Sequence, residues 1–72
     1  MNIEEATTIA EQIIDRTLDY FEVFNIYPDS HRFVDRVYDE FIEELHEEGC
    51  DDDEIDMLWA EVENMVRGYV FL

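Results

Sequence analysis

Apolar residues recur every three or four positions along three stretches of this chain, with short polar breaks between them. In the first stretch this spacing places a single apolar stripe on one side of a helix. The stripe consists of Ile3, Ala6, Ala10, Ile13, Ile14, Leu18, Phe21 and Phe24. The pattern predicts a helix over about residues 3–24, with Asn2 as its N-cap.

The same periodicity returns twice in the remainder of the chain. The second stretch carries Phe33, Val34, Val37, Tyr38, Phe41, Ile42 and Leu45. The third carries Ile55, Leu58, Trp59, Val62, Met65, Val66 and Tyr69. We therefore predict two further helices, over about residues 30–48 and 52–70.

The residues between the first two stretches predict a break in the helical chain. Pro28 disfavours helix at Tyr27, and Asp29 or Ser30 can cap the helix that follows. We expect Ile26 and Tyr27 to fold back onto the core rather than to lie in water.

Gly49 suits the first position beyond the end of the second helix, where a left-handed conformation is common. Asp51 followed by Glu54 has the spacing of a capping box at the start of the third helix, with Asp in place of Ser or Thr. Arg36 can pair with Glu40 one turn further along, and Glu63 can pair with Arg67 in the same way.

Three amphipathic helices with short connections predict one all-α domain over residues 1–72, a compact antiparallel three-helix bundle. Most aromatic residues fall on the predicted core faces. They are Phe21, Phe24, Phe33, Tyr38, Phe41, Trp59 and Tyr69. Tyr20 lies close to acidic positions instead, and there we expect an exposed ring that adds a contact to a partner.

The charge balance changes what this small bundle is expected to do. The 72 residues include 21 acids but only 4 bases, all of them arginine, which gives a net charge of −17. An apolar fraction of 47% argues against disorder despite that charge. Such a field repels nucleic acid and anionic membranes and attracts proteins with positive surfaces.

The carboxylates are concentrated on particular faces. On the first helix, five of them, from Glu4 to Glu22, fall within an arc of about 80°, and the stretch Asp39–Asp56 contains eleven acids in eighteen residues. We predict that fourteen of these carboxylates bind a partner. They are Glu4, Glu11, Asp15, Asp19, Glu22, Asp35, Asp39, Glu40, Glu43, Glu47, Asp51, Asp52, Asp53 and Asp56.

We predict no catalytic residue, no metal site and no cofactor, and hence no enzyme. The acids lie on solvated faces, whereas acid–base catalysis needs a desolvated carboxylate. A calcium loop beginning at Asp51 would need Gly at its sixth position, where Asp56 stands. Glu43 and His46 match one half of a di-iron motif that requires two. His46 and His31 are interpreted as ordinary surface or helix-end residues.

The lone cysteine, Cys50, has no internal partner, so a secreted disulfide scaffold is excluded. We interpret it as a free thiol in a turn, in a neighbourhood without the cation that reactivity would need. No apolar run reaches the length of a membrane span. We therefore expect a cytoplasmic protein, in the host cell if the chain is encoded by a phage.

In character the chain resembles the small, acidic, nucleic-acid-mimicking inhibitors of phages and mobile elements, of the anti-CRISPR and anti-restriction type. The likeness extends over the whole chain and is carried by its length, the rows Glu4–Glu22 and Asp35–Glu47, the CDDDEID run and the scarcity of bases. It implies a stoichiometric inhibitor that blocks the nucleic-acid channel of a CRISPR effector, nuclease, glycosylase or polymerase.

Three other interpretations remain open. The chain could be an acidic helical module, such as an antitoxin, an immunity-type protein or an adaptor, that binds a protein without mimicking nucleic acid. It could form a homodimer through the apolar tail Tyr69–Leu72. The charge could also be a merely solvated surface. Competition with nucleic acid separates the first interpretation from mimicry, and light scattering tests the second.

Overall fold

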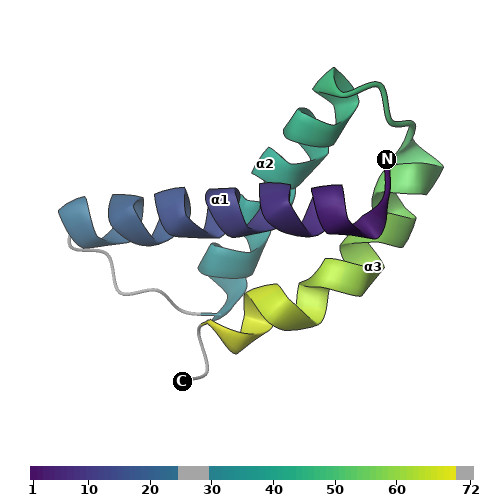
Figure 1. The fold of residues 1–72 in the computed structure, drawn as a ribbon. Coiled ribbons are helices and arrows are strands. Elements are labelled where there is room, and N and C mark those ends of the chain that lie inside the picture. The colour runs from purple at the N-terminus through teal and green to yellow at the C-terminus, as the bar shows by residue number, and fades with distance from the viewer. Residues whose placement is uncertain (25–29, 70–72) are drawn as a thin grey trace.

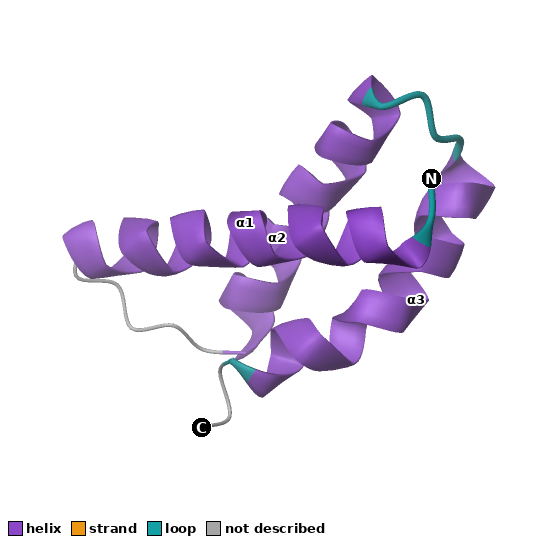
Figure 2. Cartoon of the chain, in the orientation of Figure 1, coloured by secondary structure: helices purple, strands orange, loops and turns teal. Residues whose placement is uncertain are grey.

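The computed structural model describes residues 1–24 and 30–69 and contains three helices, α1 Ile3–Val23, α2 Ser30–Glu47 and α3 Asp52–Gly68 (Figures 1 and 2). Each helix packs against the other two. α2 and α3 run in opposite directions, and α1 crosses in front of α2 in the view of Figure 1, with its N-terminal end beside α3. The prediction of an all-α three-helix bundle is confirmed, with helix ends one or two residues earlier than predicted.

Several predictions lie outside the described residues. They concern the break at Asn25–Asp29, the packing of Ile26 and Tyr27, and the tail at residues 70–72. The side chains of Ser30 and His31 are also outside the described structure, so the predictions made for them stay predictions.

Both predicted N-caps on described residues are confirmed. The Asn2 side-chain oxygen accepts a hydrogen bond from the Glu5 backbone N–H at 2.8 Å. The Asp51 carboxylate accepts one from the Glu54 N–H, also at 2.8 Å. Each bond satisfies a backbone donor that the first turn of a helix would otherwise leave free.

Gly49 ends α2 in the predicted left-handed conformation, with a φ of 91°. The Cys50 N–H donates to the Leu45 carbonyl at 3.0 Å, and the Gly49 N–H donates to the His46 carbonyl at 3.0 Å. These two bonds form a Schellman motif, in which the residue after the glycine usually makes an apolar contact. The motif therefore turns the side chain of Cys50 into the core.

The core lies where the three apolar stripes meet, and fifteen apolar side chains are buried there. They are Ala6, Ala10, Ile13, Ile14, Phe21, Phe33, Val34, Val37, Phe41, Leu45, Cys50, Ile55, Leu58, Val62 and Val66. Thr17 is buried among them because its hydroxyl donates to the Ile13 carbonyl at 2.7 Å.

Two aromatic residues predicted in the core are exposed, which corrects the sequence interpretation. Phe24 is 62% exposed and Tyr69 is 42% exposed. Both lie one residue beyond the end of a helix, Phe24 after α1 and Tyr69 after α3. The Trp59 ring instead contacts Tyr38 and Phe41, at centroid distances of 4.9 and 5.5 Å, and joins α2 to α3.

Candidate acidic interaction surface

Thirteen of the fourteen predicted partner-binding carboxylates are exposed, and only Glu40 is half-buried. Apolar residues occupy the helix positions that face the core, so the acidic residues lie on the outer faces. Because the helices are fixed by a packed core, the exposed carboxylates have fixed relative positions along each helix.

The acidic row of α1 is a single exposed series on one helix of 21 residues. Its members are Glu4, Glu11, Asp15, Asp19 and Glu22. No ion pair or hydrogen bond joins any of these five carboxylates to another described residue. The series from Glu4 to Glu22 covers about 27 Å, at 1.5 Å of rise per residue.

The five predicted partner-binding acids of α2 divide into two parts. Glu40, Glu43 and Glu47 line a small hollow beside Arg16 of α1. Asp35 and Asp39 do not line this hollow. The Arg16 guanidinium donates from Nη2 to Glu44 Oε1 at 3.2 Å. Both partners are more than a third exposed, so this pair contributes at most about 1 kcal/mol.

Of the four predicted partner-binding acids in the CDDDEID run, two have local structural roles. Asp51 caps α3, and the Asp52 Oδ1 lies 2.8 Å from the His46 Nε2 in the last turn of α2. Asp53 and Asp56 are exposed. Of these four predicted acids at the start of α3, Asp53 and Asp56 have no polar partner on the described residues.

The arginines are engaged within the chain. The Glu63–Arg67 pair is confirmed, with Nη2 and Oε1 2.9 Å apart. The predicted Arg36–Glu40 pair is wrong, because the Arg36 guanidinium carbon lies 3.9 Å from the centroid of the Tyr20 ring. Tyr20 is consequently half-buried under a cation rather than fully exposed.

With Arg16 bound to Glu44 and Arg32 also partnered, none of the four arginines is free. Their charges are therefore held by the chain itself, and most carboxylates of residues 1–24 and 30–69 have no cation as a partner.

The amino terminus forms a contact that the local sequence could not indicate. The Met1 ammonium lies 3.0 Å from Glu54 Oε2 and joins the start of α1 to the first turn of α3. The hydrogen bond and charge of Glu54 raise the pKa of the Met1 amine above 8.0. The Glu54 carboxylate therefore holds the Met1 amine, and among the described residues it accepts no hydrogen bond from the Asp51 N–H, so only the Asp51 half of the predicted capping box forms.

This contact also corrects the expectation for Cys50. The thiol is free and lies just after the turn, as predicted, but it is buried, and the Met1 ammonium is a nearby cation. Burial raises the pKa of the Cys50 thiol, the charge of Glu54 raises it further, and the ammonium only partly opposes them. The thiol is consequently protonated at neutral pH, which disfavours reactivity.

Neither a metal centre nor a membrane span is found in the described part of the chain. No three His, Cys, Asp or Glu side chains of residues 1–24 and 30–69 converge as a metal site would require. No helix among the same residues has the length and apolar character needed to cross a bilayer. Comparison with protein families, curated proteins and solved structures finds no match to this chain.

Proposed function

We propose that the chain is a non-catalytic inhibitor that binds a basic nucleic-acid-binding protein, such as a CRISPR effector or nuclease. In this proposal it occupies the DNA or RNA site of that protein by charge mimicry. The supporting observation is the density of fixed, uncompensated charge on a rigid three-helix scaffold.

The charge density can be compared directly with that of DNA. The Cα trace extends over 34 × 21 × 17 Å and the chain has a net charge of −17, which gives about one charge per 2 Å of the long axis of the trace. Duplex DNA carries one charge per about 1.7 Å of axis. A Lys/Arg-lined groove built for DNA would therefore meet a comparable charge per unit length on this protein.

The arrangement of the carboxylates supports the same proposal. Free acidic chains relieve repulsion by spreading apart, but here the core residues hold α1, α2 and α3 together. The α1 row has no internal cation, so its charge is available to a partner. The function of such a surface is binding, with the strong salt dependence of any contact to a basic groove.

The proposal is tested by capture followed by competition. The immobilised protein is exposed to a nuclease-rich lysate, bound proteins are eluted by a salt gradient, and one captured protein is purified. We expect duplex DNA or RNA to displace it competitively. A captured protein that binds the chain and nucleic acid simultaneously would contradict the proposal.

Charge reversal at Asp39, Glu43 and Glu47 tests whether the α2 group contributes. We expect binding to be abolished while helical content, followed by circular dichroism, stays unchanged or rises because like charges are removed. Unchanged affinity would exclude this group as the contact.

The second candidate function is an acidic module that binds a protein without mimicry. It is favoured by exposed apolar side chains, since Val23, Phe24 and Met57 are 77, 62 and 69% exposed. A partner that uses these residues would bind with weak salt dependence and would not compete with nucleic acid. Substitution of Met57 by Ser would then weaken binding, whereas mimicry predicts no effect.

A further inference from the structure

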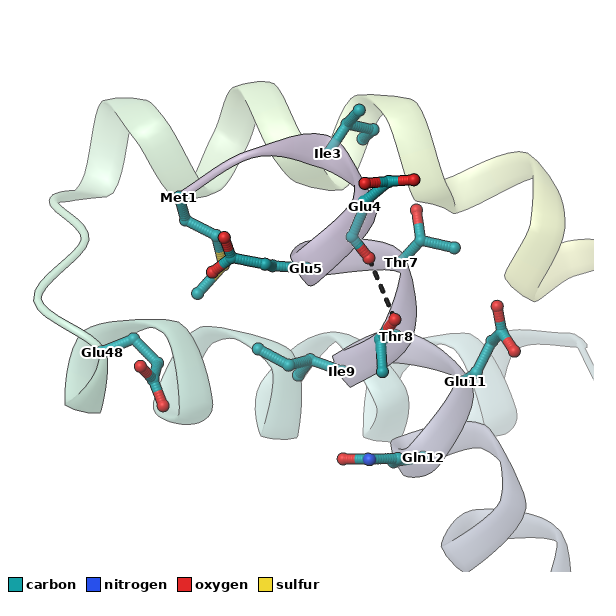
Figure 3. Close-up of a pocket in the computed structure, with 10 residues that line it drawn as sticks. All are labelled: Met1, Ile3, Glu4, Glu5, Thr7, Thr8, Ile9, Glu11, Gln12 and Glu48. Carbon is teal, nitrogen blue, oxygen red and sulfur yellow. Dashed lines mark hydrogen bonds between the residues drawn. The ribbon is translucent and has the colours of Figure 1, made fainter.

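Two consecutive hollows follow the seam between α1 and the C-terminal half of α2. The smaller, of about 150 Å³, is lined by Arg16, Glu40, Glu43, Glu44 and Glu47. The larger is an open groove of about 690 Å³ that follows the first three turns of α1 and reaches Glu48 (Figure 3). Gln12 precedes Arg16 by one helical turn, and Glu44 precedes Glu48 by one turn, so the hollows adjoin.

The smaller hollow shows which chemical group the carboxylates between α1 and α2 can bind. It already holds a guanidinium, because Arg16 Nη2 lies 3.2 Å from Glu44 Oε1. One further acceptor is left over, since Oε2 of Glu40 is buried and has no hydrogen-bond partner in the described structure. Carboxylates arranged around a guanidinium are therefore the existing chemistry of this seam.

The larger groove combines an apolar floor with acidic walls. Ile9 is half-buried, and the Met1 side chain is only 5% exposed. Figure 3 shows Glu5, Ile9 and Gln12 projecting toward the side of α1 on which Glu48 lies. No lysine or arginine lines the groove, and the Met1 ammonium is bound to Glu54.

We propose that this groove docks an arginine-bearing segment of a basic partner protein. The methylene stem of the arginine would lie on Ile9, and its guanidinium would lie between Glu5 and Glu48. Arginine suits such a site because its stem is apolar and its planar head binds carboxylates through several donors. The inference rests on the proposed function only for the identity of the partner.

The test uses a defined probe, the acetylated and amidated peptide (Gly-Arg)₄, titrated at about 0.15 M salt, where distant charges are screened. The double variant E5Q/E48Q is compared with E61Q/E63Q, which removes the same charge from α3 at sites that neither line the groove nor belong to the predicted partner-binding acids. We expect E5Q/E48Q to weaken binding about fivefold more than the control does. Equal weakening by both would overturn the proposal.

A second measurement on the unmodified protein does not depend on how the variants fold. Amide chemical shifts are followed while the arginine peptide is added, and then with a peptide of equal charge containing 2,4-diaminobutyrate, whose stem is shorter. We expect the largest shifts at residues 5–12 and 48, and tighter binding of the arginine peptide. Shifts centred elsewhere, or equal affinity for both peptides, would refute the groove.

Failure here is distinguishable from failure of the proposed function. The peptide can bind the groove even if nucleic acid displaces no captured protein. In that case the groove proposal would stand and the proposed mimicry of nucleic acid would be refuted. If nucleic acid displaces the captured protein but the peptide ignores the groove, the mimicry stands and the groove is excluded.

Discussion

At the scale of single residues, the two glycines provide a matched test of backbone conformation. Gly49 has a φ of 91°, and Gly68 lies inside the last turn of α3. A Cβ added at either position would meet no atom within 4 Å. Any difference between the two alanine variants therefore reports the backbone alone.

We predict that Gly49→Ala destabilises the fold by about 1 kcal/mol, because a Cβ is strained in the left-handed region. Gly68→Ala is predicted to be neutral or to stabilise by up to about 1 kcal/mol, since alanine is the better helix former. Urea unfolding of both variants measures the free energies. A loss of equal size at both glycines would show that positive φ is not the cause.

The Met1–Glu54 contact gives a prediction for pH. The pKa of the Met1 amine is raised above 8.0 in the folded protein, so the folded state binds the proton more tightly than the unfolded chain does. The contribution is fully present below pH 8.0 and is lost as pH rises through the folded pKa. We therefore expect stability to fall with alkaline pH, and to fall less in Glu54→Gln.

The measurement is the free energy of urea unfolding at several values between about pH 7 and pH 9, close to where an α-amine titrates. The thiol of Cys50 also has a raised pKa and acts in the same direction, so the comparison is repeated in Cys50→Ala. If Glu54→Gln has the same pH slope as the unmodified protein in both backgrounds, the contact contributes nothing.

At the scale of the helix, the depth of burial decides how much a large apolar residue contributes to the free energy of unfolding. Phe41 is 0% exposed and contacts Trp59, whereas Met57 on α3 is 69% exposed. We predict that Phe41→Ala costs about 3–5 kcal/mol, because it removes buried area and leaves a cavity. Met57→Ala should change stability by less than about 0.5 kcal/mol.

Thermal unfolding followed by circular dichroism compares these two variants. A small domain with a single core has a low free energy of unfolding, so the Phe41→Ala variant is expected to be largely unfolded near about 37 °C. Similar melting curves for the two variants would contradict the assignment of Phe41 to the centre of the core.

The helices were predictable because their determinants are local. Asn2, Gly49 and Asp51 specify helix ends through bonds to residues within five positions, and the apolar stripes need only periodicity. Phe24 and Tyr69 were mispredicted because periodicity assigns a residue to the apolar face of its own helix but does not indicate whether another element covers it there.

The contacts around the acidic surface were less predictable because they join distant segments. Met1 and Glu54 are 53 residues apart, and Arg16 and Glu44 are 28 apart. Helical spacing pairs Arg36 with Glu40 because it reveals only partners on the same helix, whereas the actual partner, Tyr20, belongs to α1. The groove that includes Glu5 and Glu48 was missed for the same reason.

At the scale of the whole molecule, the same carboxylates act on folding and on binding in opposite directions. With 17 net charges inside 34 × 21 × 17 Å, every carboxylate lies within the screening length of most others at low salt, about 30 Å at 0.01 M. Repulsion then opposes the compact state. Salt should relieve it, while weakening attraction to a basic partner.

We predict that raising NaCl from about 0.01 to about 0.5 M stabilises the fold by about 1 kcal/mol or more and raises Tm by several degrees. Over the same range, affinity for the arginine peptide or for a captured partner should fall. The variant E11Q/D15N/D19N/E22Q, which removes four charges from the α1 row, should show a smaller rise in Tm. A Tm that is independent of salt, or equally dependent in both proteins, would mean that the carboxylates are already compensated in the folded state. They would then have no excess field to offer a nucleic-acid-binding groove.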